Sequence, residues 1–168
     1  MRSILVMAAS LLLIQWTPAL AVDLPKLDRL GDVKDRSLLD TVNRKLAQQQ
    51  IRDGQFEFKT GKAEFAPGNE KRVDGLLKII TDNSNTLKAA FPNLLVTAEG
   101  HTDSDGTADF NQMLALARAK TVCNALKAKG MKLLCKPIGV GSSKPLVSPE
   151  KTAADKQKNR RVLVQLAR

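Results

Sequence analysis

Residues 100–122 read GHTDSDGTADFNQMLALARAKTV, a short polar loop that runs into a helical pattern. The loop, 102–106, carries short oxygen-bearing side chains and a glycine. The helix predicted after it extends from about Ala108 to Lys129, with Gly130 as its C-terminal stop. Free N–H groups and the dipole of a helix N-terminus favour an anionic group. This stretch therefore predicts a loop that binds an anionic group at the start of a long helix.

Side chains from this loop and helix are predicted to meet at one pocket. Asn111 and Arg118 are two helical turns apart and share a face of the helix. An apolar stripe occupies another face and consists of Leu116, Ala119, Cys123 and Leu126. With Asp103 opposite Arg118, the pocket suits a zwitterion, since the carboxylate takes an ammonium and the guanidinium grips a carboxylate. An internal salt bridge between Asp103 and Arg118 explains the same spacing, and the sequence leaves both interpretations open.

The flanking residues predict an α+β domain. The alternation of Phe56 and Phe58 indicates a strand, and residues 69–91 indicate a helix. Residues 94–99 form the second predicted strand and 133–140 the third, which Pro137 places at an edge or a bulge. After the polar loop 141–158, with one helical turn in it, Val162, Val164 and Leu166 alternate in a last strand. The predicted order is β-α-β-α-β-β, a two-layer sandwich of helices on a sheet with some parallel pairing.

The N-terminal residues predict secretion. Arg2, the apolar run 4–14 and the Pro18-Ala19-Leu20-Ala21 cleavage box indicate a signal peptide over residues 1–21. No cysteine follows the run, so we expect no lipid anchor and a periplasmic protein that is either free in the periplasm or associated with the outer membrane. Residues 22–51 are predicted as a tether, 22–36, followed by a helix from Asp35 or Ser37 to about Gln50. That helix either packs on the domain, which is predicted to span 52–168, or only spaces it from the secretion site.

Charge and composition restrict the classes of partner that the protein is expected to bind. Without residues 1–21 the chain carries 26 basic residues, because only Arg2 is lost from 27, against 17 acidic ones. This excess favours polyanions such as cell-wall polymers, although simple solubility explains it as well. Aromatic residues make up 4% and tyrosine is absent, so we expect no nucleic-acid partner, because single-strand binders need stacking platforms.

Several motifs in order resemble the OmpA-like peptidoglycan-binding domain, which also occurs in peptidoglycan-associated lipoproteins and flagellar stator subunits. They are FEFKTGKAEF at 56–65, the opening stretch at 100–122, GVGSSKP at 139–145 and NRRVLVQL at 159–166. The resemblance covers about residues 54–168, and the spacing of its motifs makes it specific. It implies the fold of that domain, which agrees with the order of elements predicted above.

The resemblance implies non-covalent binding of peptidoglycan through the diaminopimelate of the stem peptide, anchoring an envelope component to the wall. The zwitterionic end of that residue is the chemistry for which the pocket was predicted. The residues that match the family's binding positions are Asp103 and Arg118 as the principal pair, with Asn111, Thr102, Arg160 and Arg161. Which of the two terminal arginines faces the ligand stays open. Ala115, Cys135 and Pro137 depart from the family pattern, but none of them belongs to the principal pair.

The two cysteines are predicted to form a disulfide. Cys123 lies on the apolar face of the long helix, and Cys135 lies at an alternating position of the next strand, where the family usually has an apolar residue. Helix and strand are expected to pack face to face, and the periplasm is oxidising. Two free thiols in the core are the alternative.

Other functions are less well supported by the residues. His101 is the only histidine, so a metal site or a catalytic triad is not expected, and His101 is predicted to pack beside the loop. Asp103 and Asp105 resemble a calcium loop, but the downstream bidentate acid is missing. On one short loop they are also unable to flank a glycosidic bond from opposite faces. We therefore expect no enzyme, cofactor or metal. The remaining alternative is a periplasmic interaction protein that binds acidic envelope polymers or a secretion complex through its basic surface.

Overall fold

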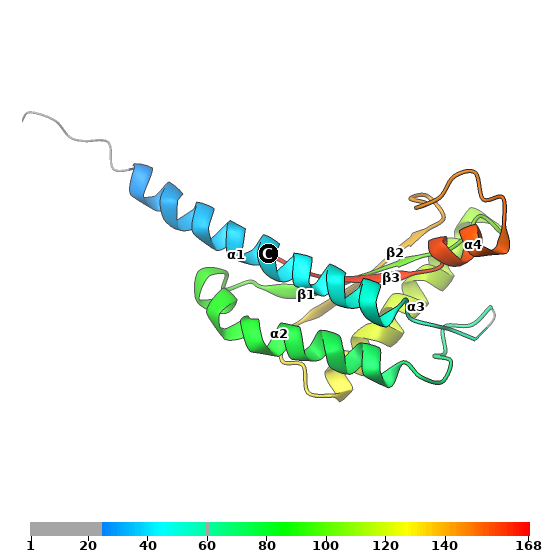
Figure 1. Ribbon diagram of the computed structural model, residues 1–168, viewed down its shortest axis with the longest axis horizontal. Coiled ribbons are helices and arrows are strands. Elements are labelled where there is room, and N and C mark those ends of the chain that lie inside the picture. Colours follow the sequence, from blue (N-terminus) through cyan, green and yellow to red (C-terminus); the bar gives the residue numbers. More distant parts are fainter. Residues whose placement is uncertain (1–24, 60) are drawn as a thin grey trace, which may run out of the picture.

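The computed structural model describes residues 25–59 and 61–168, so the predicted signal peptide, 1–21, lies outside the described residues (Figure 1). Its elements in chain order are α1 (Pro25–Asp53), α2 (Glu70–Ala90), β1 (Leu95–His101), α3 (Ala108–Ala128), β2 (Cys135–Gly141), α4 (Ala153–Asn159) and β3 (Val162–Ala167). β1 is the central strand of a sheet in the order β2-β1-β3, parallel to β2 and antiparallel to β3. The α+β prediction is confirmed.

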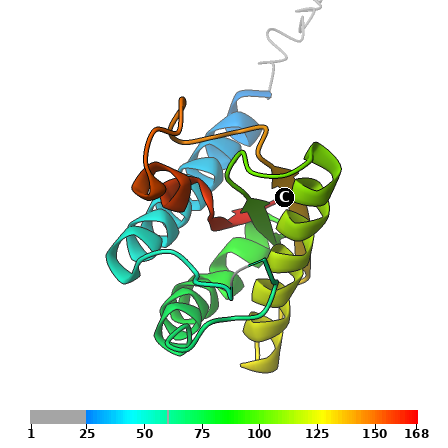
Figure 2. The ribbon, with the colours of Figure 1, turned by 90° about the vertical axis from the view of Figure 1, so that its right-hand side faces the viewer.

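The three long helices form one layer and the sheet the other. α3 packs across β1 and β2, α1 runs beside β3, and α2 lies between α1 and α3 (Figures 1 and 2). The core between the layers is built from residues that include Leu46, Leu76, Ile80, Leu87, Val96, Val122, Leu126 and Val164, each at most 1% exposed. β2 is an edge strand, which explains why it accommodates Pro137.

Helix α1 begins earlier than predicted and packs on the domain. It starts at Pro25, so the predicted tether over 22–36 is wrong from residue 25 onwards. Proline is well tolerated at the first position of a helix, where its missing N–H has no partner to lose. Leu39, Val42 and Leu46 lie in the core, so the packed unit continues through the boundary that was placed at residue 52.

Two side-chain amides of α1 cover the outer edge of β3. Asn43 accepts from Leu166 N–H at 2.8 Å and donates to Leu166 O at 3.0 Å. Gln50 does the same with Val164, at 2.8 Å and 3.1 Å. Each amide thus satisfies a main-chain pair that a neighbouring strand would otherwise take, which leaves this edge protected.

The prediction of a sheet strand at Phe56 and Phe58 is wrong. Only an isolated antiparallel bridge joins Phe58 to Phe65, in a short hairpin closed by the bond from Ala66 N–H to Glu57 O at 3.0 Å. The alternation has another cause, because the rings of Phe56, Phe58 and Phe65 pack together, with centroids 5.3–5.6 Å apart. The hairpin therefore does not extend the sheet: α1 lies beside β3, and among the described residues no strand pairs with the outer side of β2.

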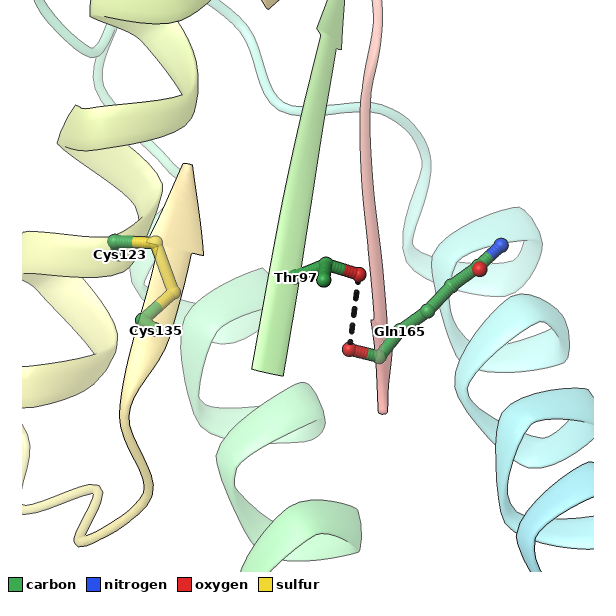
Figure 3. The surroundings of a disulfide bond; sticks show 4 residues. All are labelled: Thr97, Cys123, Cys135 and Gln165. Carbon is green, nitrogen blue, oxygen red and sulfur yellow. Dashed lines mark hydrogen bonds between the residues drawn. A yellow bond between two sulfur atoms is a disulfide. The ribbon is translucent and has the colours of Figure 1, made fainter. Parts of the chain in front are cut away.

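The predicted disulfide is confirmed. Cys123 of α3 and Cys135 of β2 are joined, with their Cα atoms 5.6 Å apart, and both residues are buried (Figure 3). Figure 3 also shows the Thr97 hydroxyl of β1, which donates to Gln165 O of the neighbouring strand β3 at 3.4 Å. The bridge ties the layers together at the end of α3 that lies away from loop 102–106.

Glycines allow α3 to lie directly on the sheet. A Cβ at Gly100 would come within 2.1 Å of Ala115 O, and one at Gly139 would come within 2.6 Å of Gln112 O. Both obstacles are main-chain atoms of α3, which have no rotamer by which to move aside. The helix that carries Asn111 and Arg118 is therefore held at a fixed distance from β1.

We expect Gly100→Ala to lower the free energy of unfolding by about 1–3 kcal/mol or more, because α3 must move away from β1. Urea denaturation followed by circular dichroism measures the loss. Gly31→Ala is the matched control, since Gly31 lies in the exposed part of α1 with no atom within 4 Å of the added Cβ. That change should stabilise the protein slightly, by removing the entropy cost of a helical glycine. Equal stability of the Gly100 variant and the natural protein would contradict the close packing.

Candidate functional site

Loop 102–106, the first half of α3, the 57–66 hairpin and α4 surround a cavity of about 420 Å³. Its lining residues are Phe58, Gly61, Thr102, Asp103, Asp105, Phe110, Asn111, Leu114, Arg118, Gln157 and Arg160. Five of the six residues predicted for the site are among them, and Arg161 is the exception. The volume lies in the range of small-molecule sites and fits one side chain of a larger polymer.

Arg118 is a buried cation with unused hydrogen-bond donors. It is 6% exposed, its Nε donates to Lys62 O at 3.1 Å, and its guanidinium lies 5.1 Å from the centre of the Phe58 ring. Within the described part of the chain, its two Nη groups have no hydrogen-bond partner. Burial lowers the pKa of Arg118, the charge of Arg160 lowers it further, and Asp103 opposes both. The Nη groups of the guanidinium can therefore donate hydrogen bonds to a bound anion.

Asp103 faces the same cavity but pairs with another arginine. Its Oδ2 accepts from Arg160 Nη1 at 2.5 Å, and Oδ1 has no hydrogen-bond partner among the described residues. The internal salt bridge between Asp103 and Arg118, which the sequence left open, is not among the ion pairs of the described residues. The cavity thus presents one unused carboxylate oxygen and one unpaired guanidinium edge.

The structure separates the two terminal arginines. Arg160 lines the cavity and bonds Asp103 and Gln157. Arg161, 5% exposed, points elsewhere and donates to Lys144 O at 3.1 Å and to Asn159 O at 3.3 Å. Arg160 therefore belongs to the candidate site, whereas Arg161 braces the loop that follows β2.

Asn111 and Thr102 shape the loop. Asn111 is buried, and its Nδ2 donates to Asp105 O at 2.9 Å and to Asp103 O at 3.4 Å, so it holds the loop more than it faces the cavity. Thr102 N–H donates to Gly141 O at 3.0 Å. The Thr102 hydroxyl is buried at the cavity and has no hydrogen-bond partner among the described residues. Thr107 caps α3 by accepting from Phe110 N–H at 3.3 Å.

Several supporting contacts were missed at the sequence level. Glu150 accepts from Ser104 N–H at 3.1 Å and from the Ser104 hydroxyl at 2.6 Å, and Lys156 pairs with Asp105 at 2.6 Å. Glu150, which precedes α4, and Lys156 of α4 thus hold the loop in place, and α4 also contributes Gln157 to the cavity. Its capping box, in which Thr152 and Asp155 bond each other's main chain, was the available signal in a segment predicted to be mostly loop.

His101 packs behind the loop, with 1% of its surface exposed and its Nε2 3.2 Å from Glu99 Oε1. Burial lowers the pKa of His101 from 6.5 to about 4, aided by the charges of Arg161 and Lys144 and opposed by Glu99. The folded protein therefore keeps this imidazole neutral in conditions under which the unfolded chain protonates it.

The stability of the protein should consequently fall in mild acid. Because the folded-state pKa of His101, about 4, lies below the unfolded value, the unfolded chain binds the extra proton between these two values. The contribution is complete above about pH 6.5 and is lost as the pH falls towards 4. Melting temperatures of the natural protein and of His101→Gln, measured from pH 7.5 to 4, give the test. A natural protein that loses no more stability in acid than the variant would contradict it.

Comparison with known proteins identifies the family. The model of the OmpA family matches residues 57–160 of the chain. The chain belongs to the OmpA family. The match includes every residue that lines the cavity, whereas α1 precedes it. The outer-membrane lipoprotein YfiB of Pseudomonas aeruginosa is 33% identical over 122 residues, covering 68% of each chain. Among the described residues, no helix is long and apolar enough to cross a membrane.

Solved structures show the same fold. The peptidoglycan-associated lipoprotein from Burkholderia pseudomallei superposes with a TM-score of 0.53 at 20% identity, over 67% of this OmpA-family chain and 87% of the other. The cell wall anchor of the T6SS from P. aeruginosa gives a TM-score of 0.52 at 20% identity, over 66% and 73%. At such identities the likeness concerns the fold alone.

Proposed function

We propose that this OmpA-family protein binds peptidoglycan without covalent attachment and anchors an envelope component to the cell wall. The pocket takes the zwitterionic end of diaminopimelate, an amine and a carboxylate on one carbon. The observation that carries the proposal is the pair of unused groups in one cavity, the Nη edge of Arg118 and the Oδ1 of Asp103. Membership of the OmpA family, and its structural likeness to a peptidoglycan-associated lipoprotein and to a cell wall anchor, support the wall as the partner.

The charges of the pocket agree with a carboxylate ligand. Arg118 and Arg160 contribute two positive charges, and Asp103 contributes one negative charge. Asp105 is already neutralised by Lys156 at 2.6 Å. A bound carboxylate gives Arg118 the charge partner that it lacks, and the ligand ammonium lies towards Asp103. Buried charge pairs are favourable when such hydrogen bonds satisfy both partners.

The remaining parts of the proposal concern the cell. A signal peptide over 1–21 delivers the protein to the periplasm. Besides peptidoglycan, the protein has a second partner, an outer-membrane or secretion-system protein. The site does this by binding alone, since its groups hold a ligand and no nucleophile–base pair was found in the sequence. Binding through the general basic surface is the alternative, and it predicts retention that fades as salt screens the charges.

We expect free meso-diaminopimelate to release the protein from purified sacculi, whereas Nα-acetyl-lysine amide, whose side chain ends in an amine without a carboxylate, should not. The reason is that only an amine and a carboxylate on one carbon engage Asp103 and Arg118 together. Co-sedimentation at low and moderate salt measures the retained fraction. Sacculi whose stems contain lysine are the matched control and should leave the protein in solution. Equal retention on both kinds of sacculi would contradict the diaminopimelate site.

A further inference from the structure

A second cavity, of about 430 Å³, lies between the C-terminal end of α1, β3 and the loop after β2. We call it the α1–β3 groove and define it by Ile51, Phe56, Leu146, Arg161, Val162 and Leu163. It shares no lining residue with the cavity that contains Asp103 and Arg118. The two cavities are therefore separate, and the proposed wall-binding role makes no use of this groove.

Apolar side chains that would be costly to leave in water gather at the groove. Ile51 is 82% exposed and Leu146 is 62% exposed, although they come from different elements, α1 and the loop after β2. The groove is also lined by Leu163, which is partly buried, and by the buried Phe56 and Val162. Exposed apolar residues that converge on one apolar hollow are typical of an interaction site, whereas isolated ones are not informative.

The groove borders the one outward pair of β3 that α1 does not cover. His101 N–H donates to Arg161 O, so the main chains of Val162, Val164 and Leu166 turn away from β1. α1 caps Val164 and Leu166 through its side-chain amides. It ends at Asp53, and in the described part of the chain no side chain caps Val162 in this way. An extended peptide finds main-chain hydrogen bonds at such an edge.

The positive charge at the groove has no carboxylate beside it among the described lining residues. Arg161 is the charged residue of the groove. The Nη groups of Arg161 bond main-chain carbonyls, and its Nε has no hydrogen-bond partner among the described residues. Burial lowers the pKa of Arg161, and the charge of Glu99 only partly opposes this. A carboxylate on the occupant is complementary to this cation.

We propose that the α1–β3 groove binds an extended segment of a partner protein. The segment lies beside Val162, places an apolar side chain between Ile51 and Leu146, and brings a carboxylate towards Arg161. An apolar residue at a free C-terminus supplies both the apolar side chain and the carboxylate. Because the groove is separate from the proposed wall site, one molecule holds the wall and a partner at the same time.

The test uses the mature protein labelled with ¹⁵N and the peptide acetyl-Thr-Val-Thr-Val-Leu with a free terminal carboxylate. We expect saturable shifts of the amide resonances of Val162 and Leu146. The same peptide ending in an amide should bind several times more weakly, because it lacks the charge. Ile51→Glu and Leu146→Glu should each weaken binding by about tenfold or more, because a carboxylate in an apolar contact is costly. Leu134→Glu is the matched control, since Leu134 is 65% exposed but lies outside the groove, and it should bind normally.

Three results would overturn the proposal. The first is the absence of shifts at the groove with millimolar peptide, and the second is equal binding by both glutamate variants. The third is that hexanoate binds as tightly as the peptide, which would assign the groove to acyl carboxylates. Two variants distinguish this proposal from the wall-binding one. Ile51→Glu should still co-sediment fully with sacculi. Arg118→Ala should bind the peptide normally whether or not the wall site is correct.

Discussion

Arg118→Ala should weaken binding to purified sacculi by about 2–4 kcal/mol, which is roughly 30- to 1000-fold in affinity. The substitution removes the guanidinium whose Nη groups are unpaired at the pocket and leaves the ligand carboxylate without a partner. Arg118→Lys should bind almost as poorly, because one ammonium does not reproduce a two-pronged contact. Co-sedimentation of both variants with sacculi measures the change.

Thr121→Ala separates binding from folding. The Thr121 hydroxyl donates to Ala63 O at 2.7 Å, so it pins the 57–66 hairpin to α3 as Arg118 does through Lys62 O. Thr121 is outside the cavity, and its variant should lose some stability but keep sacculus binding. Asp103→Asn should lose binding as well, because the ligand ammonium loses its charged partner. Intact binding by both the Arg118 and Asp103 variants would exclude the wall-binding mechanism.

Loss of the disulfide should lower the free energy of unfolding by about 3 kcal/mol, since the bridge closes a loop with a sequence separation of 12. The expected stabilisation comes from fewer conformations in the unfolded chain. Urea unfolding of the oxidised protein, the reduced protein and the double variant Cys123→Ala with Cys135→Ala gives the measurement. Sacculus binding at low temperature should change little, because the bridge lies at the end of α3 away from the loop.

The double variant also supplies the control. It has no cysteine, so reductant should leave its unfolding midpoint unchanged, while the natural protein shifts to lower urea. A natural protein whose unfolding ignores reductant, or which shows two titratable thiols when unfolded without reductant, would argue against a bridge in solution.

Much of the site could be predicted because its residues are close in sequence. Asp103, Asn111 and Arg118 come from one loop and the helix that follows it, so helical periodicity places them on one side. The disulfide depends on similarly local information, a helix packed on the next strand. The side of the pocket formed by α4 comes from a segment about fifty residues later in the sequence. It contributes Gln157 and the contacts made by Glu150 and Lys156. Helical or strand periodicity does not predict which distant segment packs against the loop.

The amino-acid pattern alone was sufficient to predict the family, the α+β class, the cysteine pair and the loop that carries Asp103. The tertiary structure shows that Arg160 pairs with Asp103, whereas Arg161 turns towards Lys144 O. Arg160 is the C-cap residue of α4 and Arg161 precedes β3, so which of them meets Asp103 depends on how these elements pack around a loop far away in the sequence. The tertiary structure also decided that α1 joins the core and covers β3. Such packing depends on which edge is vacant after the chain has folded, and the pattern of a helix alone does not contain that information.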